Sequence, residues 1–150
     1  MQNESILAKG TLQLVLTDEF GNVKQQEETN LVVNLGLAFI ASRIKDATAT
    51  VMSHMAIGTG TTAAAANQTA LVTEVARVAL ASTTIVTTNV ANDAVQFQAT
   101  FGAGTGTGAI TEAGLLNAAS SGTMLSRSVF SAVNKGANDT LTVTWKLTIQ

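Results

Sequence analysis

The sequence contains no cysteine, no proline and no tyrosine, and it has one histidine among 150 residues. Without cysteine the chain can form neither a disulfide nor a thiolate metal site, and it lacks a thiolate nucleophile. A tetrahedral metal site of histidine and cysteine is excluded as well, because His54 is the single residue of either kind. Since proline is absent, turns must depend on glycine, asparagine and aspartate.

Charged side chains are also scarce. They make up 12% of the chain, whereas typical globular chains carry about 25%. The net charge is -2 and no basic run is present, so we expect no nucleic-acid partner. Threonine, asparagine, glutamine, serine and alanine must supply much of the surface, and such a surface is cheap to desolvate. This composition favours assembly with other protein surfaces over the alternative, a neutral surface on a monomer.

The length suits a single domain. No apolar stretch reaches the roughly 20 residues that a membrane span needs, and we expect no membrane partner. The first residues, MQNESILAKG, lack the basic region and apolar core of a signal peptide. We therefore expect an N-terminal arm over residues 1–9 and one domain over residues 10–150.

Alternation of apolar and polar residues predicts strands along most of the chain. The clearest strand is the last, where Leu141, Val143, Trp145, Leu147 and Ile149 share one face. Further strands are predicted at 10–18, 23–33, 51–60, 78–89, 95–101, 108–116 and 123–130. Residues suited to turns occupy 19–22, 91–94 and 135–139.

Two segments instead favour helix. Apolar residues recur at helical spacing over 34–46, with Asn34 placed as N-cap. A second short helix is predicted over 66–76, capped by Asn67 or Thr69. About eight strands with one or two short helices predict a mainly β protein. We expect an antiparallel β-sandwich, jelly-roll-like or immunoglobulin-like.

Residues that could support catalysis are few. His54 lies between two methionines in the apolar segment VMSHMAI, which is typical of a packed or interface histidine. The acidic residues are scattered, and no spacing resembles a calcium loop. The glycine-rich stretches 57–62 and 102–108 lack the Lys-Ser/Thr pair of a phosphate loop and do not fit G-x-G-x-x-G, so they predict tight turns. We expect no catalytic, metal or cofactor-binding residues, and no enzyme.

Four charged residues stand in otherwise apolar runs. Glu74 and Arg77 lie in ALVTEVARVAL, Glu112 lies in AITEAGLL, and Arg127 lies in MLSRSVF. Charges in apolar surroundings are costly unless they are paired. We therefore predict that the two glutamates form structural ion pairs with the two arginines, within the fold or across a subunit boundary.

Three long blocks of the chain resemble small virion proteins of tailed bacteriophages. These blocks are KGTLQLVLTDEFGNVKQQEETNLVVNLGLAFIASRI, HMAIGTGTTAAAANQTALVTEVARVAL and TGAITEAGLLNAASSGTMLSRSVFSAVNKGANDTLTVTWKLTIQ. The resemblance covers most of the chain and brings no catalytic residues with it. It implies a location in the virion, after assembly in the cytoplasm of the bacterial host. The partners it implies are further copies of the chain, as a dimer or trimer, and the phage major capsid protein or tail proteins.

The expected function is that of a capsid cement or decoration protein, which stabilises the phage head by bridging major capsid subunits. A tail-fibre, adaptor or baseplate protein is the first alternative. A carbohydrate-binding module on the host-facing surface is the second. Sugar-binding sites usually stack a sugar ring on an exposed aromatic side chain. Aromatic residues are only 4% of the chain, and Trp145 falls on a predicted core face. Both observations argue against the carbohydrate-binding alternative.

Overall fold

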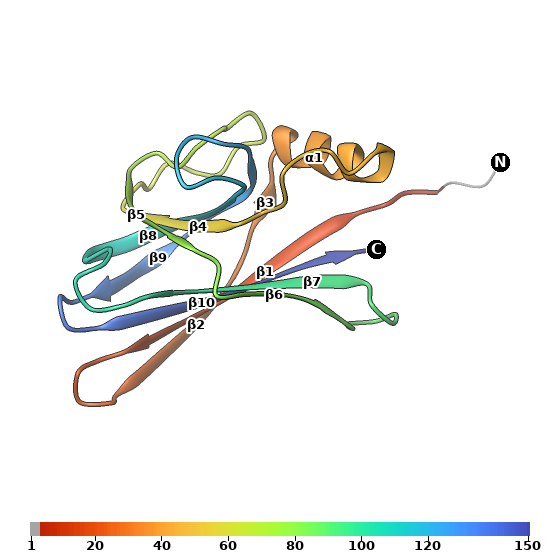
Figure 1. Ribbon diagram of the computed structural model, residues 1–150. Helices are drawn as coiled ribbons and strands as arrows, with labels where there is room; N and C mark the ends of the chain where they lie inside the picture. Colours follow the sequence, from red (N-terminus) through yellow and green to blue (C-terminus); the bar gives the residue numbers. More distant parts are fainter. Residues whose placement is uncertain (1–3) are drawn as a thin grey trace.

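The protein is a sandwich of two five-stranded sheets, seen in a computed structural model that describes residues 4–150 (Figure 1). The first sheet has the order β2 (Val23–Thr29), β1 (Ala8–Thr17), β10 (Thr140–Ile149), β7 (Ala94–Phe101) and β6 (Ser82–Val86). The second has the order β3 (Leu31–Val32), β9 (Met124–Lys135), β8 (Gly108–Leu116), β4 (His54–Gly58) and β5 (Glu74–Ala79). Every strand pair is antiparallel. The predicted antiparallel β-sandwich is confirmed.

The core lies between the sheets and is built by the period-two pattern of their strands. Leu12 of β1 lies opposite Trp145 of β10, and Leu14 lies opposite Val143. All four side chains are buried, and Trp145 is completely enclosed. Because these strands alternate apolar with polar residues, one face of the sheet joins the core and the other carries threonine and glutamine.

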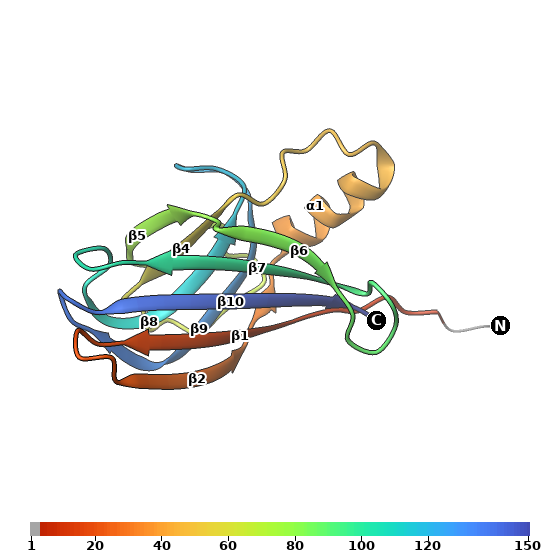
Figure 2. The same cartoon turned by 60° about the horizontal axis from the view of Figure 1, so that its bottom comes forward.

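Two segments cross from one sheet to the other, so the structure has ten strands instead of about eight (Figure 2). The predicted strand 23–33 divides at Asn30 into β2 and β3. The predicted strand 78–89 divides between β5 and β6. At the second crossing, Leu80 N–H donates to Ser53 O beside the second sheet, while Ala81 N–H donates to Gln98 O in the first. Adjacent backbone groups thus bond to different sheets.

The helix α1 (Asn34–Lys45) confirms the predicted helix over 34–46. Asn34 does not cap it, however, because Val33 is the N-cap residue and no side chain bonds there. The Asn34 backbone N–H instead donates to Ala66 O at 2.8 Å. Among residues 4–150, no helix combines the length and the apolar character needed to cross a membrane.

The predicted second helix over 66–76 is wrong. Residues 59–73 form an irregular segment, and β5 begins at Glu74. The backbone N–H groups of Val72 and Thr73 donate to the carboxylate of Glu112, so they are not paired with carbonyls of a preceding helical turn. Tertiary hydrogen bonds therefore override the helical pattern of this alanine-rich stretch.

The expected N-terminal arm of residues 1–9 is shorter in the structure. β1 begins at Ala8, and Leu7 O already accepts a hydrogen bond from Gln150 N–H at 2.8 Å. Residues 1–3 lie outside the described part of the chain, so the segment that precedes the sheet is described over residues 4–7. Ala8 and Lys9, which were expected in the arm, are therefore part of β1.

Candidate functional site

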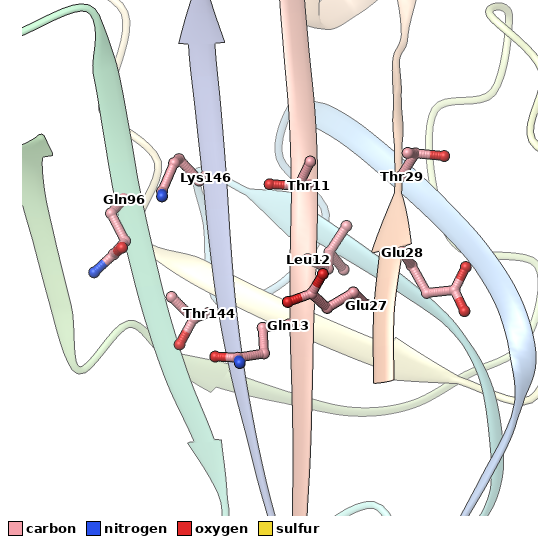
Figure 3. Close-up of a pocket in the computed structure, with 9 residues that line it drawn as sticks. All are labelled: Thr11, Leu12, Gln13, Glu27, Glu28, Thr29, Gln96, Thr144 and Lys146. Carbon is pink, nitrogen blue, oxygen red and sulfur yellow. The ribbon is translucent and has the colours of Figure 1, made fainter. Parts of the chain in front are cut away.

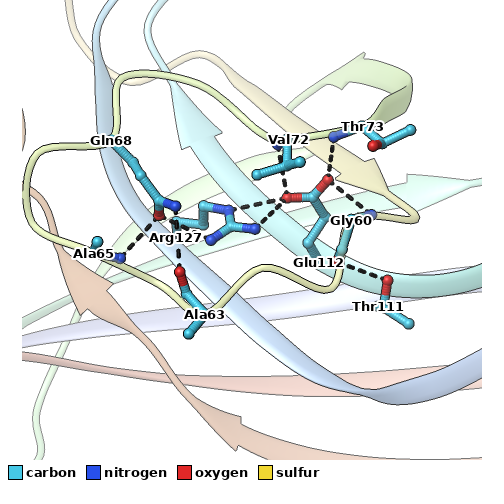
Figure 4. A network of polar contacts seen from close by, with 9 residues as sticks. All are labelled: Gly60, Ala63, Ala65, Gln68, Val72, Thr73, Thr111, Glu112 and Arg127. Atoms are coloured by element: carbon cyan, nitrogen blue, oxygen red, sulfur yellow. Dashed lines mark hydrogen bonds and ion pairs between the residues drawn. The ribbon is translucent and has the colours of Figure 1, made fainter.

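A buried ion pair lies on the face of the second sheet that points away from the core. Glu112 of β8 and Arg127 of β9 both have side chains with 0% exposure. Arg127 Nε and Nη2 donate to Glu112 Oε2 at 2.9 and 2.7 Å (Figure 4). Burying a charge is costly unless it is paired and its other polar atoms are bonded, so the remaining partners of the pair decide what it does.

Glu112 uses those remaining positions to hold residues 59–73, called the anchored segment below. Its Oε1 accepts the backbone N–H groups of Gly60 at 3.1 Å and Thr73 at 2.7 Å. Its Oε2 also accepts the Val72 N–H at 3.0 Å. One carboxylate therefore fixes both ends of the anchored segment against the sheet.

Arg127 reaches the middle of the same segment through Gln68. Arg127 Nη1 donates to Gln68 Oε1 at 2.8 Å, and that oxygen also accepts the Ala65 N–H at 2.9 Å. The side-chain amide of Gln68 donates to Ala63 O at 3.3 Å. The network in Figure 4 thus connects the sheet to the beginning, middle and end of the anchored segment.

Small residues in the sheet make room for this arrangement. A Cβ on Gly58 would lie 2.6 Å from Glu112 Oε1, and a Cβ on Gly114 would lie 2.9 Å from the Leu71 side chain. Leu71 is the buried apolar contact of the anchored segment, in a cluster with Val33, Ala56, Leu116 and Met124. The glycines of 57–62 therefore permit close approach instead of forming the predicted tight turn.

The balance of burial and hydrogen bonding keeps Glu112 ionised. Burial raises the pKa of its carboxyl group. The hydrogen bonds from Thr73, Val72 and Arg127, together with the positive charge of Arg127, lower the pKa by more than burial raises it. The net pKa lies below the ordinary glutamate value. A charged carboxylate is the form that can accept five hydrogen bonds, so the network is assembled at neutral pH.

The second predicted pair lies nearer the surface. Arg77 of β5 donates from Nε and Nη2 to the two carboxylate oxygens of Glu74, at 2.9 and 2.7 Å. Arg77 Nη1 also donates to Ala118 O at 3.0 Å and Ser121 O at 2.9 Å. The structure thus places all four charged residues in two pairs within one chain, and Arg77 joins β5 to the connection between β8 and β9.

The outward side of the anchored segment is uncharged. No residue from 59 to 73 is acidic or basic. Its exposed side chains between 61 and 70 are small or amide-bearing: Thr61, Thr62, Ala63, Ala65, Ala66, Asn67, Thr69 and Ala70. A surface held in one conformation before binding loses little conformational entropy on binding. The arrangement is therefore suited to contact with another protein surface.

A second surface lies on the outer face of the first sheet. A shallow depression of about 550 Å³ crosses β7, β10, β1 and β2 (Figure 3). Its lining includes Thr11, Gln13, Glu27, Gln96, Thr144 and Lys146. These side chains offer hydrogen-bond donors and acceptors, and no aromatic residue is among those that line the depression. It can therefore bind polar groups but provides no ring for stacking.

His54 does not join either surface. It is half-buried at the start of β4, where its Nδ1 lies 2.8 Å from Ser53 Oγ. Within residues 4–150, no group of three or more histidine, aspartate and glutamate side chains is placed to hold a metal ion. Among residues 4–150, no acidic side chain forms a hydrogen bond with His54.

The role of Gln68 and of the backbone donors was not evident from sequence. The isolated charges of Glu112 in AITEAGLL and Arg127 in MLSRSVF indicate buried ion pairs, but they do not point to residues 60–73. The sequence of those residues predicts a turn and a helix, because a carboxylate that caps a distant loop leaves no local pattern.

No protein-family model matches the chain, and searches of curated proteins and of solved structures gave no match either.

Proposed function

We propose that this chain is a structural protein of a tailed-phage particle, a cement or decoration protein that bridges major capsid subunits. The observation that carries the proposal is the anchored segment, an uncharged surface fixed to a β-sandwich by the buried Glu112–Arg127 pair. Contacts through such a surface require little desolvation of charge and little ordering. Both properties favour a protein that binds many equivalent neighbours.

The resemblance supports the same proposal at the level of residues. The block 54–80, which resembles phage virion proteins, contains the whole anchored segment. The block 107–150 contains Glu112 and Arg127, which hold it. In a symmetric particle, many modest contacts act together, so each one needs only moderate strength.

Copy number in purified particles tests the proposal. Phage particles from a host that carries the genome encoding this chain are purified, and the chain is quantified by mass spectrometry against the major capsid protein. A head protein repeated by the capsid symmetry is expected on the order of hundreds of copies per particle. Absence of the chain from purified particles would refute the proposal.

The same copy-number measurement distinguishes a tail protein from a head protein. A fibre, adaptor or baseplate protein follows the lower symmetry of the tail, so a few to a few dozen copies would favour it. The resemblance supports both locations, since virion proteins of this kind also occur as tail components. The cement role is proposed first because the uncharged, rigid surface suits lateral contacts in a large lattice.

A pair of variants tests whether the anchored segment makes the contact. Thr62→Glu places a charge on its exposed side, while Thr100→Glu places one on the exposed outer face of the first sheet. Both side chains are exposed, so both variants should fold. We expect Thr62→Glu to be incorporated into particles poorly and Thr100→Glu to be incorporated normally. Equal incorporation would show that the anchored segment is not the contact surface.

A carbohydrate-binding module is the second candidate, favoured by the polar depression of Figure 3. Glutamine, threonine and charged side chains there could hydrogen-bond sugar hydroxyl groups. A glycan-binding assay with the intact chain and with Gln13→Ala tests it. Glycan binding that is lost in the variant would favour this candidate, and no detectable binding by the intact chain would remove it.

A further inference from the structure

An apolar groove opens between α1 and the inner face of the first sheet. In Figures 1 and 2, α1 lies toward the end of the sandwich where β1 begins and β10 ends. The volume of the groove is about 520 Å³. Phe39, Ile40, Ile44, Phe97, Leu147 and Ile149 are among the residues that line it. Ile44 is 80% exposed, although it is an isoleucine at the edge of an apolar groove. Single exposed apolar residues are common, but one at the rim of an apolar groove can extend that groove as a contact surface.

The chain carries a short apolar segment at the same end. Ile6 is 81% exposed and Leu7 is 50% exposed. Leu7 is tied to Gln150 by backbone hydrogen bonds in both directions. From there the chain runs outward, away from the body of the protein (Figure 1). Residues 4–7 therefore extend away from the groove of their own chain, where a neighbouring molecule could contact them.

The charges of segment and groove are complementary. In an extended chain, residues two apart share a face, so Glu4 lies on the same side as Ile6. Arg43 lines the groove, and its Nη1 donates to the carbonyl oxygens of Ala47 and Ala49. Among residues 4–150, no carboxylate forms an ion pair with Arg43. A segment with an acid beside an apolar residue matches that lining.

The short length of the segment limits where the receiving groove can lie. Four extended residues span only about 13 Å. The segment joins β1 at Ala8, which lies opposite Ile149, and Ile149 is itself part of the groove. A second copy can therefore receive the segment only if its own groove faces this end. Two copies facing in this way are related by a two-fold axis, and each segment then reaches the other groove.

We propose that residues 4–7 of one copy bind in the groove of a second copy, and that the exchange is reciprocal and forms a homodimer. Ile6 enters the apolar groove beside Ile44, and Glu4 approaches Arg43. The proposal does not depend on the particle role, because it concerns a different surface from the anchored segment.

Disulfide cross-linking between two variants tests the exchange, since the chain has no cysteine of its own. Ile6→Cys and Ile44→Cys are purified separately, mixed and mildly oxidised. We expect a disulfide-linked dimer that contains one chain of each variant. Phe20→Cys replaces Ile44→Cys in the control, because Phe20 is 82% exposed at the opposite end of β1. That mixture should give no comparable dimer.

The double variant Ile6→Cys with Ile44→Cys distinguishes exchange from insertion of a segment into its own groove. Exchange gives cross-linked dimers on a non-reducing gel, whereas self-insertion gives an oxidised monomer. An oxidised monomer, or the absence of any cross-link, would overturn the proposal.

Sedimentation equilibrium of the intact chain supplies an independent test. We expect a dimer, and we expect Ile6→Asp to raise its dissociation constant at least about tenfold, because an isoleucine no longer enters the groove. Phe20→Asp should leave the constant unchanged. Glu4→Lys should weaken the dimer, and adding Arg43→Glu should restore it. A chain that is monomeric at every concentration, or a dimer indifferent to Ile6→Asp, would contradict the exchange.

Discussion

Glu112 Oε2 accepts hydrogen bonds from both Nε and Nη2 of Arg127, and neither side chain is exposed to solvent. The two residues lie on β8 and β9, adjacent strands in the interior of the second sheet. Through this pair, an irregular surface segment is bonded to two central strands of the second sheet.

Removing the charge of Glu112 should be strongly destabilising. Glu112→Gln leaves Arg127 buried without a counter-charge, which typically costs about 3–5 kcal/mol of unfolding free energy. Urea denaturation of both proteins measures the difference. Glu74→Gln is the matched control, since Glu74 is partly exposed and such pairs contribute at most about 1 kcal/mol. Equal losses in the two variants would contradict the account.

The same substitution should loosen the anchored segment before the rest of the fold. The N–H groups of Val72 and Thr73 donate to Glu112, so hydrogen exchange at these two amides should accelerate in Glu112→Gln. The amides of Trp145 and Leu147 in β10 should change only as much as global stability does. A uniform change across all four amides would mean that Glu112 stabilises the fold without holding the segment.

The stabilisation by Glu112 should depend on pH in a defined direction. Its pKa is lower in the folded protein than its ordinary value of 4.5. A lowered pKa means that the folded state resists protonation, so the stabilisation is complete above that value and is lost as pH falls through the folded-state pKa. The free-energy difference between the intact chain and Glu112→Gln should therefore shrink in acid.

Comparing these two proteins is necessary because other carboxyl groups contribute to acid sensitivity. Hydrogen bonds lower the pKa of Asp18, from Asn22, and of Asp93, from Val90. Both groups are present in the intact chain and in the variant, so their effects cancel in the difference. A difference that grows as the pH falls would contradict the sign assigned to Glu112.

Gly114 should tolerate no side chain. A Cβ there would lie 2.9 Å from the Leu71 side chain, so Gly114→Ala must displace Leu71 and the segment that carries it. Overpacking of this kind costs about 1–3 kcal/mol. Gly102→Ala is the control, because a Cβ at Gly102 meets no atom within 4 Å. Thermal unfolding of both variants measures the contrast, and equal midpoints would show that Leu71 moves without cost.

Among the core residues, Trp145 should contribute most to the free energy of unfolding. It is completely buried, and truncation of such a residue to alanine typically costs about 3–5 kcal/mol. Its Nε1 has no hydrogen-bond partner among the described residues, so Trp145→Phe sacrifices no hydrogen bond and should cost less. Chemical denaturation of both variants tests the order, and a near-zero loss for Trp145→Ala would assign the residue to an interface.

The strands were the part of the fold most accessible from sequence. β8 and β10 have the predicted bounds. In β10 they follow from alternation over ten residues, which is a strong pattern. The crossings at Asn30 and at Leu80 were not predictable in the same way. The chain stays extended through both, and the switch of hydrogen-bond partners from one sheet to the other marks them.

The candidate site was predictable only in its charges. Glu112 and Arg127 are conspicuous as charges among apolar residues, but the segment they hold is not. The spacing of Leu71, Val72 and Val75 favours helix, and that preference is overridden by a carboxylate some forty residues later in the chain. A contact between segments so far apart leaves no periodic pattern, and the helix predicted over 66–76 failed for this reason.

The central claim is that this chain is a structural component of a phage particle, and a cryo-electron microscopy map of that particle tests it most directly. We expect density for the ten-stranded sandwich on the particle, repeated by the symmetry of the capsid, with residues 61–70 against a neighbouring subunit. Particles that are complete and contain no such density in head or tail would contradict the claim.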